Sequence, residues 1–182
     1  MRANYWKCLL SLAAALSFAA CSPHGYHPSY RGAKPVALAD VRFDDGDTFF
    51  IKGKPIRVLG IDTPEIAHAA LGIHEGQPYG EAAAESTRVM LTRAKRIEYV
   101  SGGRDRYRRT LAHIFVDGEL LAVRLIRMGL AYETVSYYGD SGFPDLAQRI
   151  VDASRAVPKP KFEAPYKWKR RQRKARESQK NP

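Results

Sequence analysis

The chain is poor in cysteine, since Cys8 and Cys21 are the only two among its 182 residues. So few cysteines cannot form the disulfide framework that stabilises many small secreted domains. No cysteine and histidine cluster has the spacing of a zinc site either. The fold must therefore depend on a hydrophobic core, and a chain of this length is expected to form one domain.

A long hydrophobic run is also missing. Residues 9–20 are mostly apolar but are too few to span a bilayer as a helix. With Arg2 and Lys7 before them, they are typical of an export signal. The next feature is Cys21 itself, because residues 18–21 resemble a bacterial lipobox, in which the cysteine is acylated and becomes the new amino terminus.

We therefore expect residues 1–21 to be a lipoprotein-type signal peptide that is removed before Cys21. Acylation of Cys21 would anchor the exported protein to a membrane of the cell envelope. Ordinary signal cleavage, which would give a secreted or periplasmic protein, is the alternative. Cys8 is lost with the signal, so the mature chain could not form an internal disulfide.

The formal net charge of +11 is not spread evenly along the chain. Ten Lys or Arg residues against two Glu give residues 157–182 a charge of +8, and the signal adds +2, which leaves +1 for residues 22–156. A basic tail attracts phosphate backbones or anionic lipid surfaces, but a solvated, partly disordered end is the common alternative. Phe162, Tyr166 and Trp168 favour docking of its first part on the domain.

Turn signals divide the rest of the chain into short elements. The segments expected to be strands are 35–43, 47–52, 56–59, 96–100 and 110–116. Helical spacing of apolar residues predicts helices at 81–93, 119–128 and 144–156. In the second helix Leu121, Leu125 and Met128 should share one face. This pattern predicts an α+β fold with an antiparallel sheet, and it is compatible with a five-stranded closed barrel.

Two acidic runs stand out, residues 45–48 and 62–65, with Arg57 between them and Arg109 beyond. Carboxylates suit hard divalent cations, and guanidinium groups suit phosphate oxygens. Each run alone has an ordinary explanation. Asp45-Gly46 is typical of a hairpin turn, with Asp45 as its turn-forming residue. Residues 62–65 could be a helix cap followed by Pro at the first helical position.

The order and spacing of five sequence blocks resemble the thermonuclease family, the staphylococcal-nuclease-like domains. The resemblance runs from Val36 to Tyr138 and more loosely to Val157. Its blocks are residues 45–48, 57–65, 79–82, 105–112 and 129–131. The family usually has a glycine just before its second catalytic arginine, and here Arg108 stands in that place.

The resemblance implies a five-stranded antiparallel OB-fold β-barrel with three helices over residues 35–157. Residues 22–34 would form a flexible tether before it, and residues 158–182 a basic tail after it. The implied activity is that of a calcium-dependent nuclease acting on DNA and RNA. It would cut on the 5′ side of the phosphate and leave 3′-phosphate ends. We expect a monomer.

The resemblance also assigns roles to residues. Arg57 and Arg109 would bind the phosphate, and Glu65 would be the general base. One calcium ion would be held by Asp47, Asp62 and the main-chain carbonyl of Thr63.

Two tyrosines, Tyr107 and Tyr137, match aromatic positions that line the family's nucleotide pocket, with Tyr138 as the alternative to Tyr137. His68 and His74 are expected to be loop residues rather than metal ligands.

Two other functions remain open at this point. One is a catalytically silent OB-fold lipoprotein that binds nucleic acid, and the other is a surface lipoprotein whose tail binds a membrane or envelope polymers. The retention of the five residues Asp47, Arg57, Asp62, Glu65 and Arg109 favours the enzyme.

Overall fold

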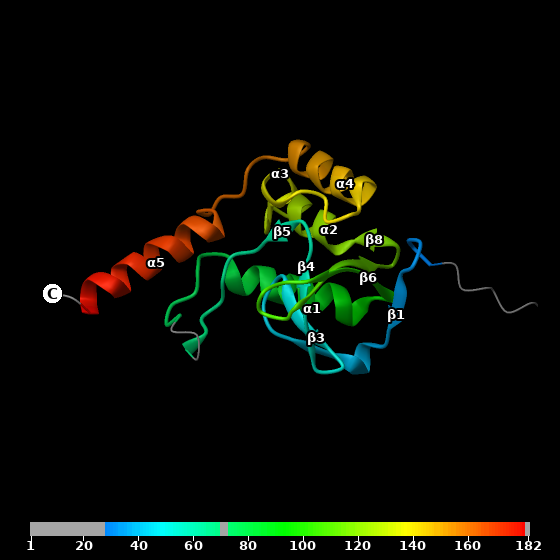
Figure 1. Ribbon diagram of the computed structural model, residues 1–182, viewed down its shortest axis with the longest axis horizontal. Helices are drawn as coiled ribbons and strands as arrows, with labels where there is room; N and C mark the ends of the chain where they lie inside the picture. Colours follow the sequence, from blue (N-terminus) through cyan, green and yellow to red (C-terminus); the bar gives the residue numbers. More distant parts are fainter. Residues whose placement is uncertain (1–27, 70–72, 181–182) are drawn as a thin grey trace, which may run out of the picture.

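The computed structural model describes residues 28–69 and 73–180 (Figure 1). The predicted signal, Cys21 and part of the predicted tether lie outside these residues. Of the helices in the described residues, none is both long enough and apolar enough to cross a membrane.

The elements are short and follow the predicted order closely. The strands are β1 (Lys34–Val36), β2 (Val41–Phe43), β3 (Thr48–Ile51), β4 (Lys54–Val58), β5 (Ile61–Asp62), β6 (Ile97–Arg104), β7 (Thr110–Val116), β8 (Glu119–Leu120) and β9 (Tyr132–Glu133). The helices are the 3-10 turn η1 (Leu38–Asp40), α1 (Gly80–Arg93), α2 (Leu121–Arg127), α3 (Val135–Tyr138), α4 (Pro144–Arg155) and α5 (Pro165–Lys180).

The main sheet is curled. Its strand order is β1-β6-β7-β4-β3-β2, with β8 paired to β7, while β5 and β9 form a separate pair. The two edge strands β1 and β2 follow each other in the chain, separated by η1, so one bent segment borders both edges of the sheet. This confirms the predicted α+β class and is consistent with an OB-type fold.

The predicted sheet differs from the observed one in two respects. The main sheet of the described residues has seven strands rather than five. In addition, β4 and β7 pair in parallel, with Arg57 opposite Leu111. The chain leaves β4 and passes through α1 and β6 before β7 returns beside it. A crossover of that length permits a parallel pair, which a short hairpin cannot form. The parallel pair places the start of β7 next to the middle of β4.

The core lies between the sheet and helices α1, α2 and α4. Fully buried side chains include Phe49 and Phe115 from the sheet, Leu125 from α2 and Ile150 from α4. The predicted helices at 81–93 and 144–156 are confirmed within a residue or two. The predicted helix at 119–128 starts late, because its first two residues pair with β7 as β8. Met128 lies at the end of α2 and is 54% exposed, whereas Leu121 and Leu125, predicted on the same face, are buried.

The described residues form five α-helices where three were predicted, since α3 and α5 were not expected. Phe162 and Trp168 are buried, which confirms that the first part of the tail docks on the domain, whereas Tyr166 is 58% exposed and does not take part. The hydroxyl of Tyr132 donates a 2.7 Å hydrogen bond to the Phe162 carbonyl oxygen. Tertiary packing by these two aromatics therefore orders a segment that composition alone made look disordered.

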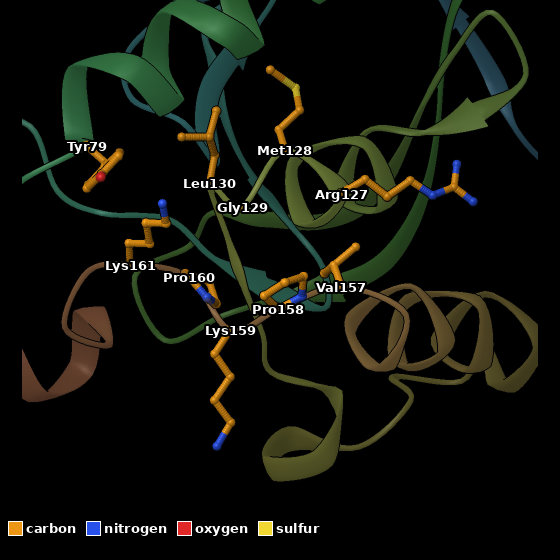
Figure 2. Close-up of a pocket in the computed structure, with 10 residues that line it drawn as sticks. All are labelled: Tyr79, Arg127, Met128, Gly129, Leu130, Val157, Pro158, Lys159, Pro160 and Lys161. Carbon is orange, nitrogen blue, oxygen red and sulfur yellow. The ribbon is translucent and has the colours of Figure 1, made fainter.

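A pocket of about 370 Å³ lies under this docked segment (Figure 2). Its lining residues are Tyr79, Arg127, Met128, Gly129, Leu130, Val157, Pro158, Lys159, Pro160 and Lys161. It contains none of the predicted catalytic or metal-binding residues, which lie in a separate polar network.

Candidate active site

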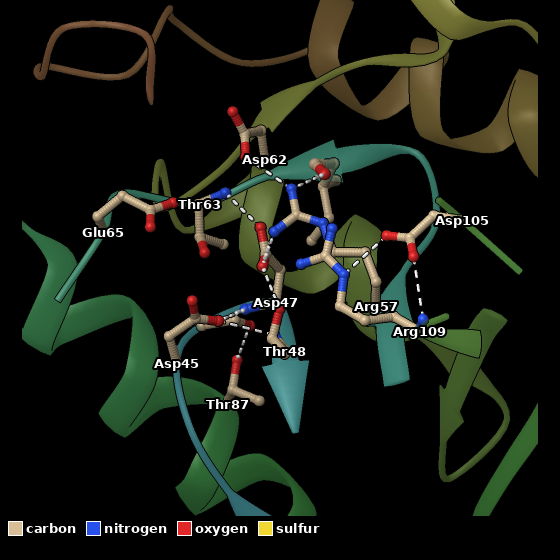
Figure 3. A network of polar contacts seen from close by, with 12 residues as sticks. Asp45, Asp47, Thr48, Arg57, Asp62, Thr63, Glu65, Thr87, Asp105 and Arg109 are labelled. Carbon is tan, nitrogen blue, oxygen red and sulfur yellow. Dashed lines mark hydrogen bonds and ion pairs between the residues drawn. The ribbon is translucent and has the colours of Figure 1, made fainter. Parts of the chain in front are cut away.

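The carboxylate of Asp47, directly before β3, is the centre of a buried polar network (Figure 3). Its Oδ1 accepts hydrogen bonds from the Arg57 guanidinium and from the Thr48 hydroxyl, the latter at 3.2 Å. Its Oδ2 accepts the Thr63 backbone N–H at 2.8 Å. A buried carboxylate needs such compensation to remain charged. The network therefore holds a negative charge at a fixed point.

Arg57 joins the two acidic runs. The antiparallel register of β3 and β4 sets Thr48 opposite Arg57, which brings the guanidinium next to Asp47. The same guanidinium donates a 2.6 Å hydrogen bond to Asp62. Burial alone would lower the pKa of Arg57, but the Asp47 and Asp62 carboxylates outweigh it and raise that pKa. Arg57 is therefore a permanent, oriented cation between two carboxylates.

The turn before β3 explains the first acidic run. The Asp45 carboxylate accepts the backbone N–H groups of Asp47 and Thr48, at 3.0 and 2.7 Å, which confirms its turn-forming role. Burial first, and then the Asp47 charge, raise the pKa of Asp45 to about 8. Gly46 is required by packing, because a Cβ there would lie 2.8 Å from the Thr63 hydroxyl oxygen. The turn thus brings the first acidic run into close contact with the second, at Thr63.

Residues 62–65 do not cap a helix, so that interpretation was wrong. Asp62 pairs with Tyr132 at the β5–β9 ladder, and the chain then runs without regular structure through Glu65. The Glu65 carbonyl oxygen accepts the Gln77 N–H at 2.7 Å, and a Cβ on Gly80 would collide with it. Backbone contacts with the start of α1 therefore fix Glu65 beside the network.

Lys169, on α5, is the site residue that sequence reasoning missed. Its Nζ lies 2.6 Å from Oε1 of Glu65 and 3.5 Å from Oδ1 of Asp62. Burial would lower the pKa of Lys169, but these two carboxylates raise it overall. The aromatic residues of the tail indicated docking, yet nothing in the spacing showed which lysine would reach the site.

A divalent cation has suitable donors here, although no group of three or more His, Cys, Asp or Glu side chains in the described residues is arranged to hold one. Asp47, Asp62 and Glu65 supply hard oxygen donors, which fit calcium or magnesium. These three carboxylates face two cations, Arg57 and Lys169, so negative charge remains for a bound ion. The donor chemistry therefore fits the predicted ion.

Arg109 stands at the entrance to β7, beside β4 in the parallel pair, and Figure 3 shows it with Arg57 and Asp105. Asp105 accepts the Arg109 backbone N–H at 2.9 Å and its Nε at 2.7 Å. Burial would raise the pKa of Asp105, but the hydrogen bonds from Arg109 lower it overall. The Arg109 Nε donates its hydrogen bond to Asp105, and no hydrogen bond in the described residues uses the Arg109 Nη atoms. The two Nη groups are therefore available to bind an anion.

Arg108 has a φ of +66°, the left-handed conformation that glycine adopts easily. The turn that the family's usual glycine would favour is therefore kept, and it leaves Arg108 exposed while Arg109 is half-buried. The assignment of Arg109 as the inward arginine agrees with this geometry.

The two predicted aromatic residues do not join the buried network. Tyr107 is 64% exposed, with the Arg109 guanidinium 5.6 Å from its ring centre. Tyr137 is 83% exposed and packs against Tyr138 on α3. Tyr138 is 73% exposed, so all three tyrosines present ring surface on which a base can stack. His68 pairs with Asp44 at 3.0 Å.

Comparison with known proteins places these residues in a family context. A sequence model of the family described as "Staphylococcal nuclease homologue" matches residues 55–156. Over 95 residues the chain is 38% identical to a thermonuclease of Staphylococcus intermedius, covering 50% of this chain and 55% of that protein. A thermonuclease of Staphylococcus hyicus gives 38% over 96 residues, with the same coverage. The endonuclease YncB of Bacillus subtilis is 33% identical over 117 residues, covering 59% of this chain and 54% of that protein. The chain thus spans about half the length of the curated relatives it matches.

Proposed function

The chain belongs to the family of staphylococcal nuclease homologues, and on that basis we propose that it is a nuclease that hydrolyses phosphodiester bonds of nucleic acid. The observation that carries the proposal is Arg57, held between Asp47 and Asp62 with Glu65 fixed nearby. This arrangement supplies oriented cations for a phosphate and carboxylates for a metal and a base. A simple binding module would not need the buried carboxylates.

Arg57 and Arg109 would hold the non-bridging oxygens of the scissile phosphate. Their orientation is fixed in advance, Arg57 by Asp47 and Asp62 and Arg109 by Asp105. Such donors interact more strongly as negative charge grows in the transition state, and they need no rearrangement at that moment.

Glu65 would accept the proton of the attacking water. A general base has to lie within hydrogen-bond reach of the water it activates, and the contacts of its backbone with the start of α1 hold it at the edge of the network. The Lys169 ammonium contacts the same carboxylate, so Lys169 has to yield part of this contact when the water binds.

The ion would be calcium, held by Asp47, Asp62 and the main-chain carbonyl of Thr63. When bound, a divalent ion neutralises phosphate charge and polarises a coordinated oxygen. The Thr63 backbone is already tied to Asp47 through its N–H, so these ligands belong to one rigid unit. Exposed Tyr107 and Tyr137 would stack on bases flanking the cut, which tolerates both DNA and RNA.

Further parts of the proposal come from the sequence. Cleavage on the 5′ side of the phosphate with 3′-phosphate products is what the family resemblance implies. Export and a lipid anchor at Cys21 follow from the signal-like residues 1–21, and we expect a monomer.

The direct test is hydrolysis of single-stranded DNA and of RNA by the purified mature protein with calcium, with magnesium and with chelator. We expect activity with calcium that chelator abolishes, and products whose 3′ ends accept a nucleotide only after phosphatase treatment. Tight binding of nucleic acid without hydrolysis under all three conditions would instead support the silent binding protein.

A further inference from the structure

Helix α5 begins at the active site rather than at a remote end of the molecule. Trp168 and Phe162 are 5% and 7% exposed, and both pack on the domain next to the first turn of α5. The ring of Phe162 contacts those of Tyr79 and Tyr132, with centroids 5.7 and 5.3 Å apart. This anchor places Lys169, the residue after Trp168, on the Glu65 and Asp62 carboxylates.

Beyond this anchor, α5 projects away from the domain (Figure 1). The helix carries eight Lys or Arg residues and one Glu, whereas residues 22–156 have a net charge of only +1. Most of the positive charge of the mature chain is therefore concentrated along a rod that starts at the predicted catalytic carboxylates.

The positive charges of α5 separate into faces. Lys169, Arg173 and Arg176 are spaced by four and three residues, so they lie along one face of a helix. At 1.5 Å per residue they span about 10 Å, which equals about three 3.4 Å phosphate-to-phosphate steps along the axis of a duplex strand. Arg173 also has a 3.8 Å contact with Glu177, but both side chains are about two-thirds exposed, and such pairs are weak.

We propose that this 169–173–176 face binds the phosphate backbone of the substrate strand next to the scissile phosphate, so that α5 forms one side of the substrate cleft. The inference rests on the proposed nuclease function. A phosphate backbone is the partner expected for this face because it complements the positive charge. The face is also continuous with the site, since a phosphate chain lying on Arg57 and Arg109 can reach Lys169 directly. Lys169 would then exchange its contact with Glu65 for one with a phosphate.

The opposite face of α5 provides a matched control. Lys167, Arg170 and Lys174 have the spacing three and four, and they point away from the first face. The variants are therefore Lys169→Ala/Arg173→Ala/Arg176→Ala and Lys167→Ala/Arg170→Ala/Lys174→Ala. Each removes three positive charges, and alanine preserves helix propensity.

Binding of a fluorescein-labelled twelve-nucleotide oligo-dT is measured by anisotropy in chelator over a series of salt concentrations. Each phosphate contact on a single strand contributes about 0.7 to the slope of log affinity against log salt. The first variant should have a slope shallower by about 2, and the second should stay close to the parent protein. A four-nucleotide oligo-dT, too short to reach along α5, should show a smaller difference between the two variants.

Equal losses in both variants would overturn the inference, because they would show a tail that acts through bulk charge. If the two variants differed in binding to anionic phosphatidylserine vesicles but not to DNA, the inference would be overturned and the face would instead bind a membrane surface. Helicity is checked by circular dichroism so that a melted α5 is recognised, and then single substitutions at Arg173 and Arg170 repeat the comparison. An inactive parent protein that keeps the face-specific slope would refute the nuclease function alone, whereas an active parent with no such difference would refute this inference alone.

Discussion

In the network around Asp47 each charge has a fixed partner, whereas along α5 most charges face solvent. The side chains of Asp47 and Arg57 are 1% and 16% exposed, and hydrogen bonds hold both. On α5, Arg173 is 66% exposed. A buried charge lowers stability unless hydrogen bonds and opposite charges compensate it. The network around Asp47 therefore holds its charged groups at fixed positions. Exposed charges are weakly oriented, and salt screens them. Helix α5 can therefore attract an anion but can do little to orient it.

The largest loss of activity and stability is expected on substitution of Asp47, in the buried network. Asp47→Ala removes a predicted metal ligand and leaves the buried Arg57 without its main partner. Activity should fall about a thousandfold or more, because several kcal/mol of charge stabilisation disappear. The free energy of unfolding should also drop by about 3–5 kcal/mol, the usual effect of breaking a buried pair. Initial rates, calorimetric calcium titration and urea denaturation measure the three quantities.

Asp152→Ala is the control for that variant, since the Asp152 side chain is 61% exposed on α4. It should change neither rate nor stability measurably. A fully active Asp47→Ala protein would show that the buried network is purely structural.

The next largest effect separates two neighbouring arginines. Arg109→Lys should lower kcat by roughly 10²–10³, because an ammonium cannot reproduce a fork held by Asp105 through Nε. Arg108→Lys should leave kcat nearly unchanged, since Arg108 is exposed. Steady-state kinetics on one oligonucleotide compare the two. Equal losses, or a larger one at Arg108, would reassign the phosphate contact.

A third effect, on the pH dependence of stability, is expected from the buried residue His113. His113 is 2% exposed, and neither ring nitrogen has a hydrogen-bond partner in the described residues. Burial lowers the pKa of His113 to about 4, with the Asp145 charge opposing this and Arg149 adding to it. The unfolded chain therefore takes up this proton first, near pH 6.5, and the folded protein loses stability as the pH falls from 6.5 to 4.

The expected loss from His113 is on the order of 2–3 kcal/mol across that range. Urea denaturation of the parent protein and of His113→Leu at pH 7, 5.5 and 4 measures it. The leucine variant should lose less stability on acidification, and parallel curves for the two proteins would contradict the prediction.

The sequence predicted the compact region well because its signals are local. Asp45-Gly46 specifies a turn, and the next family block, residues 57–65, carries both Arg57 and Asp62. The positive φ of Arg108 could not be read from its side chain, since few residues other than glycine adopt it. Lys169 could not be identified at all, because its contact with Glu65 spans about a hundred residues and depends on how Trp168 packs. The same reason explains the missed helix α5.

The smallest predicted effect tests Lys169, whose contacts join α5 to the buried network. Lys169 contacts Asp62, a proposed calcium ligand, and the neighbouring Glu65, so its charge should compete with that ion. The Lys169 side chain is 42% exposed, and a pair of that exposure contributes at most about 1 kcal/mol. Lys169→Ala should therefore raise calcium affinity by about two- to fivefold in a calorimetric titration without nucleic acid. Arg170→Ala, one residue further and exposed, removes the same charge from α5 and should raise it less. A similar rise in both variants would mean that calcium responds to the overall charge of the tail. Weaker binding in Lys169→Ala would mean that Lys169 organises the carboxylates for the ion, and the two regions would then form one site.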